Sequence, residues 1–525
     1  MIKDKRLSTA GTVLAFQSSC ADISPYLKVV GILSPAKIMA LNSGTQLLTI
    51  NNWRLPPEIM SEIFILCTTV KMRSLDDLDP EQDISTPLQL SLTYVCRLWH
   101  SIANSTPALW KSLRIYLPLD HRTNQSVQDI QQWISRSGQL PLSIQVHHNP
   151  SLPMTLSGPR LDDVINLVNS YSHRWESLKI TLIPELLSRF RNSSSGPAIL
   201  KTLILAPVCK FDLRQHSFNI GASFSSPTYV SLSLNYVWPL GICWDEVTRF
   251  TARRIRVGRA LEILRLPPQL QEFILFELWR ENDDDLPSSP VLHSRLETLH
   301  VYLSLKAVSY QLMDHITLPS LKHFNCSAHH LPVDSIVDFL DRSGCSLETF
   351  SLRDADIDED DITYLLCAMP HLESLTLGTR YITDKLLKLL AATAVLSPYP
   401  NNQLGVAFLP KLQSLKCIGR PIFSWSRLPI VFGSRTTDES GASDGASESG
   451  TSESGTSEAG ISETGASESG AVDRRPLRSF TVVQDVNDSD YPEASVVAEL
   501  EHLREEGYVI DIVFGRVKSL LIGGV

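Results

Sequence analysis

The chain lacks any run of apolar residues long enough to cross a membrane. Its 525 residues are 43% hydrophobic and 20% charged, an ordinary balance for globular domains or one long repeat array. Residues 12–16 form a short apolar stretch after three basic residues, but polar residues interrupt it at Gln17. We therefore expect neither a secretory signal nor a membrane partner.

The sequence also lacks paired cysteines. An odd number of them, nine, is scattered without disulfide or zinc spacing: Cys20, Cys67, Cys96, Cys209, Cys243, Cys326, Cys345, Cys367 and Cys417. Several lie on apolar stripes, where a free thiol behaves as a small buried hydrophobe. This usage favours a reducing compartment, so we expect a cytoplasmic or nuclear protein.

An excess of basic charge is missing as well. The formal net charge is −10, and residues 436–470 contain eight acidic side chains and no basic one, so the rest of the chain carries only −2. A nearly neutral body gives no electrostatic argument for a nucleic-acid partner. The densest basic run, Arg253 to Arg256 with Arg259, is typical of a solvated strand or loop.

No catalytic or metal-binding pattern is evident. The pairs at His147 and His329 lack partners at metal-ligand spacing, and the acidic run from Asp354 to Asp361 lacks EF-hand spacing and precedes a helix that its carboxylates would cap. Residues 441–445 match the hydrolase nucleophile elbow but lie in a tract that cannot form its strained turn. We predict no catalytic residue, metal or cofactor, and no enzyme.

Two short apolar helices are predicted between Leu55 and Trp110. The first begins at Pro56-Pro57-Glu58, with proline and an acidic residue in the first turn, and the second runs from Thr86-Pro87 to Asn104. The first carries Ile59, Met60, Ile63, Phe64, Leu66, Cys67 and Val70 at helical spacing. The second carries Leu88, Leu92, Val95, Cys96, Trp99, Ile102 and Ala103. Two such helices cannot satisfy each other's apolar faces, so we expect them to bind a partner.

The order and spacing of these residues resembles an F-box, with a long acidic connection at residues 71–85. The alternative is an ordinary helical hairpin inside a larger domain. The resemblance implies docking on the Skp-type linker subunit of an SCF ubiquitin ligase, and through it on a cullin. We predict these linker-binding residues: Leu55, Pro56, Ile59, Ile63, Leu92 and Val95. Trp99 is expected to pack the two helices together.

A short apolar phrase recurs after the helices, at an interval near 25 residues between Leu270 and Leu372. Its copies begin at Trp175, Leu200, Leu270, Leu296, Leu321, Leu347, Leu372 and Leu412. The period is that of leucine-rich repeats, in which each phrase is a strand and a helix returns along the other face. Helices are expected at 335–341, ending near Gly344, and at 362–369. The repeats lack the usual asparagine and vary in length, so we expect a degenerate array stacked as a curved solenoid.

The predicted fold is therefore α/β, with an N-terminal helical F-box followed by a curved leucine-rich-repeat-like solenoid. The expected domains are an N-terminal extension at 1–50, the F-box at 51–110, the solenoid at 111–434, a disordered Gly/Ser/Glu tract at 435–472 and a terminal solenoid unit at 473–525. The tract would be a solvated loop, with phosphorylation of its serines as an alternative. Phrases around residues 133–142 and 174–175 are similar to mushroom-type fungal F-box proteins.

These observations favour a substrate-recognition adaptor of an SCF-type ubiquitin ligase that captures an unknown protein target. The alternatives are a repeat scaffold outside the ubiquitin system or a hydrolase whose Ser, His and Asp residues meet on folding. Alternation along the strands predicts a polar target-binding strip: Thr298, His300, His323, Asn325, Thr349, Ser351, Ser374 and Thr376. Loops at the edge of the array are the other candidate surface.

Overall fold

The computed structural model describes a large part of the chain in two compact units. The described residues are 55–71, 87–117, 126–148, 159–192, 199–206, 216–220, 226–233, 237–279, 286–303, 311–328, 331–353, 357–378, 384–392, 395–396, 408–419, 423–432, 473–474, 477–484 and 492–514. Unit 1 holds the elements from α3 to β5 and most of β7, and unit 2 holds β6 and the elements from β8 to β20. The N-terminal extension and the tract at 435–472 lie outside the described residues.

Unit 1 begins with helices. These are α3 (Pro57–Lys71), α4 (Leu88–Val95), α5 (Arg97–Asn104) and the short 3₁₀ helix η1 (Pro107–Trp110). One long helix was expected between Thr86 and Asn104, and that expectation is wrong. The backbone of Cys96 is extended, with φ −160° and ψ 171°, so the segment is divided into α4 and α5.

Four parallel strands follow in unit 1, in the order β1 (Ser112–Leu117), β2 (Leu142–His148), β3 (Trp175–Thr181) and β4 (Thr202–Leu205). The connecting helices are α6 (Val127–Arg136), α7 (Pro159–Ser170), η2 (Ser172–Arg174) and α8 (Pro184–Leu187). The strands β5 (His216–Asn219) and β7 (Val237–Gly241) form a separate pair. A capping box between Ser126 and Asp129 begins α6.

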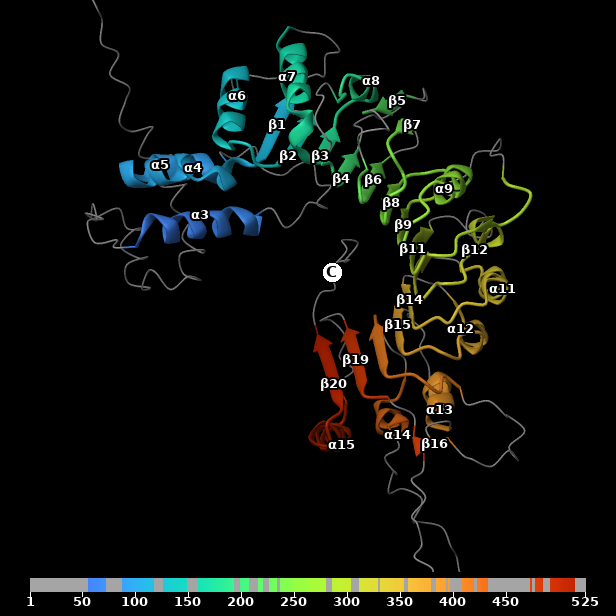
Figure 1. Cartoon of the computed structure of the whole chain (residues 1–525). Coiled ribbons are helices and arrows are strands. Elements are labelled where there is room, and N and C mark those ends of the chain that lie inside the picture. Colours follow the sequence, from blue (N-terminus) through green and yellow to red (C-terminus); the bar gives the residue numbers. More distant parts are fainter. Residues whose placement is uncertain are drawn as a thin grey trace, which may run out of the picture. The chain divides into compact units, whose positions relative to one another are not determined.

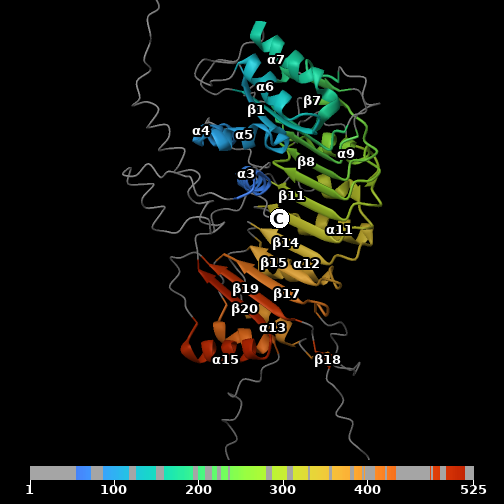
Figure 2. The ribbon, with the colours of Figure 1, turned by 60° about the vertical axis from the view of Figure 1, so that its left-hand side comes forward.

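Unit 2 is built on ten parallel strands, each paired with the next strand of the same series (Figure 2). They are β6 (Tyr229–Ser233), β8 (Arg249–Arg253), β9 (Glu272–Phe276), β11 (Thr298–Leu303), β13 (His323–Ala328), β14 (Thr349–Arg353), β15 (Ser374–Gly378), β17 (Ser414–Ile418), β19 (Ser479–Gln484) and β20 (Val509–Phe514). Two small pairs join β10 (Val291–Leu292) to β12 (Ile316–Thr317) and β16 (Val395–Leu396) to β18 (Asp473–Arg474). The strand phrases predicted from residue 270 to residue 412 all coincide with strands of this series.

Helices of unit 2 lie along one side of these strands (Figure 1). They are α9 (Val257–Leu264), α11 (Val333–Ser343), α12 (Glu359–Cys367), α13 (Asp384–Ala392), η3 (Trp425–Arg427), α14 (Leu428–Val431) and α15 (Ala494–Glu505). The predicted stop at Gly344 is confirmed, because this residue ends α11 in the left-handed conformation that glycine adopts without strain. The capping role is confirmed for Asp358, whose carboxylate accepts the Asp361 backbone N–H at 2.8 Å. Asp354 and Asp356 lie outside the described residues.

The core of unit 2 contains a ladder of large apolar side chains, one from each strand of the series from β8 to β20. Neighbouring strands pair so that members of the ladder fall opposite one another, and each member is at most 1% exposed: Phe250, Phe273, Leu299, Phe324, Phe350, Leu375, Leu415, Phe480 and Ile510. The ladder faces the helices, since the ring of Phe324 lies 6.1 Å from that of Phe339 on α11. Alternation then places the residues between ladder positions on the opposite face of the strands.

Candidate functional site

The helical region, residues 55–110 of unit 1, is held together by aromatic and aliphatic contacts between its helices. Phe64 of α3 and Trp99 of α5 have ring centroids 4.9 Å apart, and both side chains are buried. The hydroxyl oxygens of Thr106 and Ser61 lie 2.9 Å apart and join the segment after α5 to α3. The packing role predicted for Trp99 is confirmed.

Cys96 explains how the chain turns between α4 and α5. Its Sγ accepts the backbone N–H of Trp99 at 3.5 Å, so a cysteine occupies the N-cap position of α5. Sulfur is a weak acceptor, but the contact satisfies one of the donors that a helix N-terminus leaves unpaired. The break also turns Tyr94 and Leu98, which stand on either side of it, outward: they are 72% and 51% exposed.

Trp110 connects the helical region to the first strand and helix that follow it. Its indole Nε1 donates to the Ala103 carbonyl oxygen at 2.7 Å, and its ring packs edge-on against Trp133 of α6 at 4.8 Å. The guanidinium of Arg136 lies 4.5 Å from the Trp110 ring centroid, a cation–π distance. Trp110 is fully buried between the helices and the first strands, and both belong to unit 1. The predicted F-box boundary at residue 110 is therefore not a boundary between the compact units.

Exposed large apolar side chains are concentrated in the helical region. Of the 13 in the described residues, five lie here: Leu55, Ile59, Leu66, Tyr94 and Leu98. Ile59 and Leu66 are seven residues apart on α3, which places them on one side of that helix. Scattered exposed apolar residues are common on proteins, but a group within one short segment marks an interaction site.

The predicted linker-binding residues divide into two groups. Leu55, Pro56 and Ile59 are exposed, and Val95 is half-buried at the end of α4. Ile63 and Leu92, however, are 8% and 2% exposed, because α3 and the α4–α5 pair cover each other at these positions. For Ile63 and Leu92 we correct the prediction: they stabilise the helical packing and offer almost no surface. Leu66, Tyr94 and Leu98 are also exposed, but they were not among the predicted linker-binding residues.

The predicted target-binding strip lies on four neighbouring strands of unit 2. The pairing of β11, β13, β14 and β15 aligns its residues in two rows, Thr298–His323–Thr349–Ser374 and His300–Asn325–Ser351–Thr376. Seven of them are partly exposed, opposite the buried ladder. Ser351 is the exception at 6% exposed, because its small side chain lies between Asn325 and Thr376. Its assignment to solvent is therefore wrong.

A polar contact fixes the centre of the strip. The side-chain amide of Asn325 donates to Nε2 of His300 at 2.8 Å, which requires a neutral imidazole. Burial lowers the pKa of His300, Glu272 opposes that effect, and His323, Arg353 and Arg249 add to it. The hydrogen bond therefore places a neutral imidazole at the centre of the strip.

The same face continues past the predicted strip onto β8 and β9. In the next row, strand pairing aligns Arg253, Phe276, Tyr302, Ser327 and Arg353. The rings of Phe276 and Tyr302 stack 4.4 Å apart, and the Arg253 guanidinium lies 5.2 Å from the Phe276 ring centroid. From the sequence, Arg253 was expected to lie in a solvated basic run. The row could have been found from spacing, because its members lie two residues beyond the position that corresponds to His300 in each strand.

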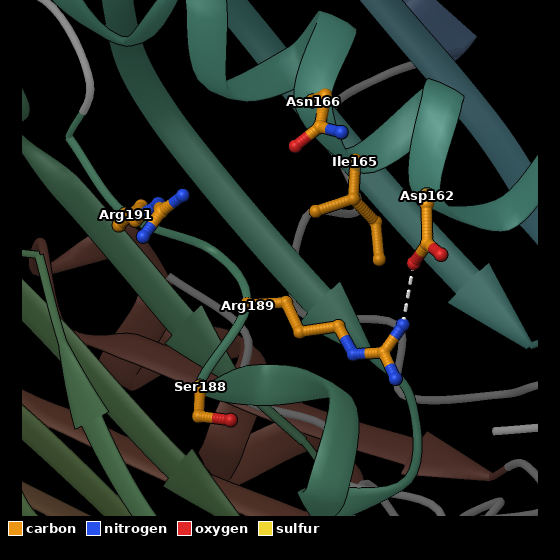
Figure 3. Close-up of a pocket in the computed structure, with 6 residues that line it drawn as sticks. All are labelled: Asp162, Ile165, Asn166, Ser188, Arg189 and Arg191. Atoms are coloured by element: carbon orange, nitrogen blue, oxygen red, sulfur yellow. Dashed lines mark hydrogen bonds and ion pairs between the residues drawn. The ribbon is translucent and has the colours of Figure 1, made fainter. Parts of the chain in front are cut away.

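A small hollow of about 400 Å³ lies between α7 and the segment after α8 in unit 1 (Figure 3). Asp162 and Arg189 form an ion pair across it at 2.6 Å. The Ser188 hydroxyl donates to the Glu185 carbonyl oxygen at 3.3 Å. No histidine or cysteine is among the residues that line the hollow. These contacts do not form a nucleophile with its base.

Within the described residues, no group of three or more His, Cys, Asp or Glu side chains is placed to hold a metal ion. The described helices include none that is long and apolar enough to span a bilayer. The histidine pair at 329–330 and the elbow-like pattern at 441–445 lie outside the described residues. His147 lies on β2, where its Nε2 is 3.3 Å from Oε1 of Gln145.

Residues 52–116 match the family model named F-box-like. The match spans α3, α4, α5 and η1 and reaches into β1, so it covers the helical region with its exposed apolar side chains. It confirms that the chain carries an F-box-like domain, and it stops before the remaining strands. No curated protein matches the chain by sequence.

Proposed function

We propose that this protein is the substrate-recognition adaptor of an SCF-type cullin-RING ubiquitin ligase. The observation that carries the proposal is the group of exposed apolar side chains within the F-box-like segment. Single exposed apolar residues are common, but a group of them within one short segment marks an interaction surface. The partner that an F-box domain implies is a Skp-type linker, and through it a cullin.

The linker would contact Leu55, Pro56 and Ile59 from the original prediction, with Val95 at the edge. We add Leu66, Tyr94 and Leu98, whose exposed fractions lie between 51% and 72%. Aromatic and large aliphatic anchors commonly dominate binding energy at such interfaces. Ile63 and Leu92 would act indirectly, by holding the helices that present these anchors.

We interpret the strands of unit 2 as degenerate leucine-rich-like repeats in a curved solenoid that captures a protein target. Support comes from the parallel register of consecutive strands and from strand starts near 25 residues apart between β9 and β15. The strip from Thr298 to Thr376 would contact the target. The likeness to mushroom-type fungal proteins belongs to the same proposal, as does action in the cytoplasm or nucleus.

The adaptor role requires neither catalysis nor a cofactor from this chain. We propose that it is not an enzyme and that ubiquitin transfer is performed by the ligase it joins. In this mechanism the F-box-like domain anchors the chain, and the strands of unit 2 hold a target within reach of the transferring subunit.

Co-purification with a Skp-type linker tests the proposal. The full chain should form a stable complex with the linker and, after addition of cullin and RING subunits, support ubiquitin transfer to captured protein. The double variant Ile59→Ala with Leu66→Ala should lose the linker. Leu292→Ala, which truncates a leucine 67% exposed on β10, is the matched control and should keep it.

Two results would reject the adaptor. A folded full chain that does not bind the linker would favour a repeat scaffold outside the ubiquitin system. Turnover of a generic ester or phosphoester by the isolated chain would favour a hydrolase.

A further inference from the structure

A row of three unlike side chains distinguishes one part of the strand face of unit 2. Arg253, Phe276 and Tyr302 occupy paired positions on β8, β9 and β11, and each is half-buried. They alternate with Ala252, Leu275 and Val301, all fully buried in the core. The row therefore lies on the face opposite the buried ladder, beside the strip that contains His300.

The row is a preformed stack. The rings of Phe276 and Tyr302 are nearly parallel, at an interplanar angle of 16°, and the Arg253 guanidinium lies over Phe276. Cation–π contact orders the arginine side chain, so less conformational entropy is lost when it binds a ligand. Planar aromatic surface beside a fixed guanidinium suits a ligand with both an anionic and an apolar group.

The charge of Arg253 is not neutralised within the described part of the chain. Its neighbours are paired: Arg249 with Glu272 and Arg254 with Glu277. Arg253 has no such carboxylate among the described residues, and its Nε is buried with no acceptor there. An oxyanion at the remaining guanidinium N–H groups would lower the cost of this charge.

A second exposed arginine, Arg353, lies in the same row on β14. It also lacks an ion pair with a described carboxylate, and its charge contributes to the lowered pKa of His300. Four strand spacings separate it from Arg253, which is about 19 Å and corresponds to about six residues of extended peptide. Asp354 and Asp356 follow Arg353 in the sequence but lie outside the described residues, so Arg253 is the stronger anchor.

We propose that this row, Arg253–Phe276–Tyr302–Ser327–Arg353, binds an acidic peptide segment that crosses the strands in an extended conformation. One carboxylate of the peptide pairs with Arg253, an apolar or aromatic side chain packs on the Phe276–Tyr302 stack, and a second carboxylate reaches Arg353. The identity of this peptide as a ubiquitination target rests on the proposed function. Peptide binding itself does not.

A nucleic acid fits this surface less well, although it is also anionic. Glu348 directly precedes β14, the strand that contains Arg353, and Glu373 directly precedes the neighbouring β15. These two carboxylates would repel a phosphate backbone that runs along the sheet. Two arginines separated by a stack give discrete contacts, whereas sites for single-stranded nucleic acid combine stacking aromatics with a continuous basic groove along the backbone. A short peptide crossing near the carboxyl ends of the strands avoids the glutamates.

Fluorescence anisotropy with the purified full chain tests the proposal. The probe is a labelled extended peptide with blocked termini, a glutamate at each end of a span of about six residues, and a tyrosine between them. A peptide with glutamines in place of the glutamates is the ligand control. A labelled single-stranded oligonucleotide of similar length is the nucleic-acid arm.

The acidic peptide should bind in a salt-sensitive way, and the glutamine peptide should bind at least about tenfold more weakly. Arg253→Glu should weaken binding by about tenfold or more, and Arg353→Glu by less. Phe276→Ser should weaken it without changing the salt dependence. Arg265→Glu, the same charge change at the exposed end of α9, is the matched control and should bind as the wild type does.

The outcomes separate this proposal from the adaptor function. Arg253→Glu should still co-purify with the linker, and the linker-deficient double variant should still bind the peptide. Equal binding of the two peptides, tighter binding of the oligonucleotide, or an Arg253→Glu variant that binds normally would each overturn the acidic-peptide site. Loss of linker binding alone would overturn only the adaptor.

Discussion

The helical region exposes large apolar side chains, whereas the strands of unit 2 bury them. In the helical region, Ile59 and Leu66 are 48% and 59% exposed on α3. In unit 2, a continuous ladder buries one large apolar residue from each strand of the series from β8 to β20, and polar residues such as Thr349 and Ser374 cover the other face. The first surface can bind by excluding water, and the second must bind mainly by satisfying polar groups and charges, with the Phe276–Tyr302 stack as its apolar part.

The comparison also helps to explain why a family model matches the helical region. An apolar docking surface depends on a few large residues at fixed helical spacing, and residues 52–116 match a family model. A parallel ladder tolerates Phe, Leu or Ile at each position, since any of them fills the same layer, as Phe324, Phe350 and Leu375 do. The strand phrases are therefore recognisable as a pattern but carry little family-specific information.

The largest expected effect comes from the ladder. Phe350→Ala removes a fully buried ring that lies 5.7 Å from Phe324, and we expect it to lower the free energy of unfolding by about 3 to 5 kcal/mol. Thr349→Ala, the adjacent residue on the opposite face, should cost less than about 0.5 kcal/mol. Chemical denaturation of both variants measures the difference. Equal losses would mean that the two faces of β14 contribute equally to the free energy of unfolding.

The same pairing of variants tests the helical region. Ile63→Ala opens a cavity in the buried packing and should cost about 2 to 5 kcal/mol of stability. Ile59→Ala, one turn earlier and 48% exposed, should leave stability within about 0.5 kcal/mol of wild type but weaken linker binding by about 2 kcal/mol. Thermal unfolding and a linker titration separate the two. If Ile59→Ala destabilises the fold as much as Ile63→Ala does, the exposed apolar group is structural.

The sequence predicted much of this arrangement. The stop of α11 at Gly344 and the strand phrases from residue 270 onward were both predictable, because each depends on local spacing and capping. The break at Cys96 was not, since the apolar stripe runs through it and no proline or glycine marks it. Strands β6 and β8 lie where the interval between repeats changes, so the period did not identify them.

The candidate surfaces were harder to predict than the elements. Whether Ile63 or Ile59 is exposed depends on how α3 packs against α5, which helical spacing alone does not decide. Ser351 is covered by residues from two other strands, and Arg253 meets Phe276 only through strand pairing. Such contacts between distant parts of the chain follow from register, and register is a property of the folded sheet.

Charge reversal on the polar strip should have a smaller effect than these core changes. His323 and Thr349 are paired neighbours on β13 and β14, so His323→Glu with Thr349→Arg alters one continuous patch. We expect capture of the target to weaken by about tenfold while linker binding is unchanged. Quantitative mass spectrometry of co-purified proteins measures this, with Asp338→Lys on the exposed side of α11 as the control. An unaltered set of captured proteins would place target binding at the loops instead.

The smallest expected effect is on the pH dependence of stability, and it comes from one histidine on the strands of each unit. Burial, with Lys179 and Arg114, lowers the pKa of His147 on β2 to about 3, against an ordinary value of 6.5. Between those values the unfolded chain binds a proton that the folded chain does not, so His147 lowers stability as the pH falls from about 6.5 towards 3. At pH 5.5 the loss is about 1 kcal/mol relative to pH 7.5.

His147→Gln should therefore be less sensitive to acid than the wild type when urea unfolding is followed at the two pH values. His300→Gln should show the same sign with a smaller change, because Glu272 partly offsets the lowered pKa of His300 in unit 2. The other acidic and basic groups of the chain titrate equally in wild type and variant, so the difference between them isolates each histidine. Parallel pH dependence of wild type and His147→Gln would show that this imidazole is protonated in the folded chain.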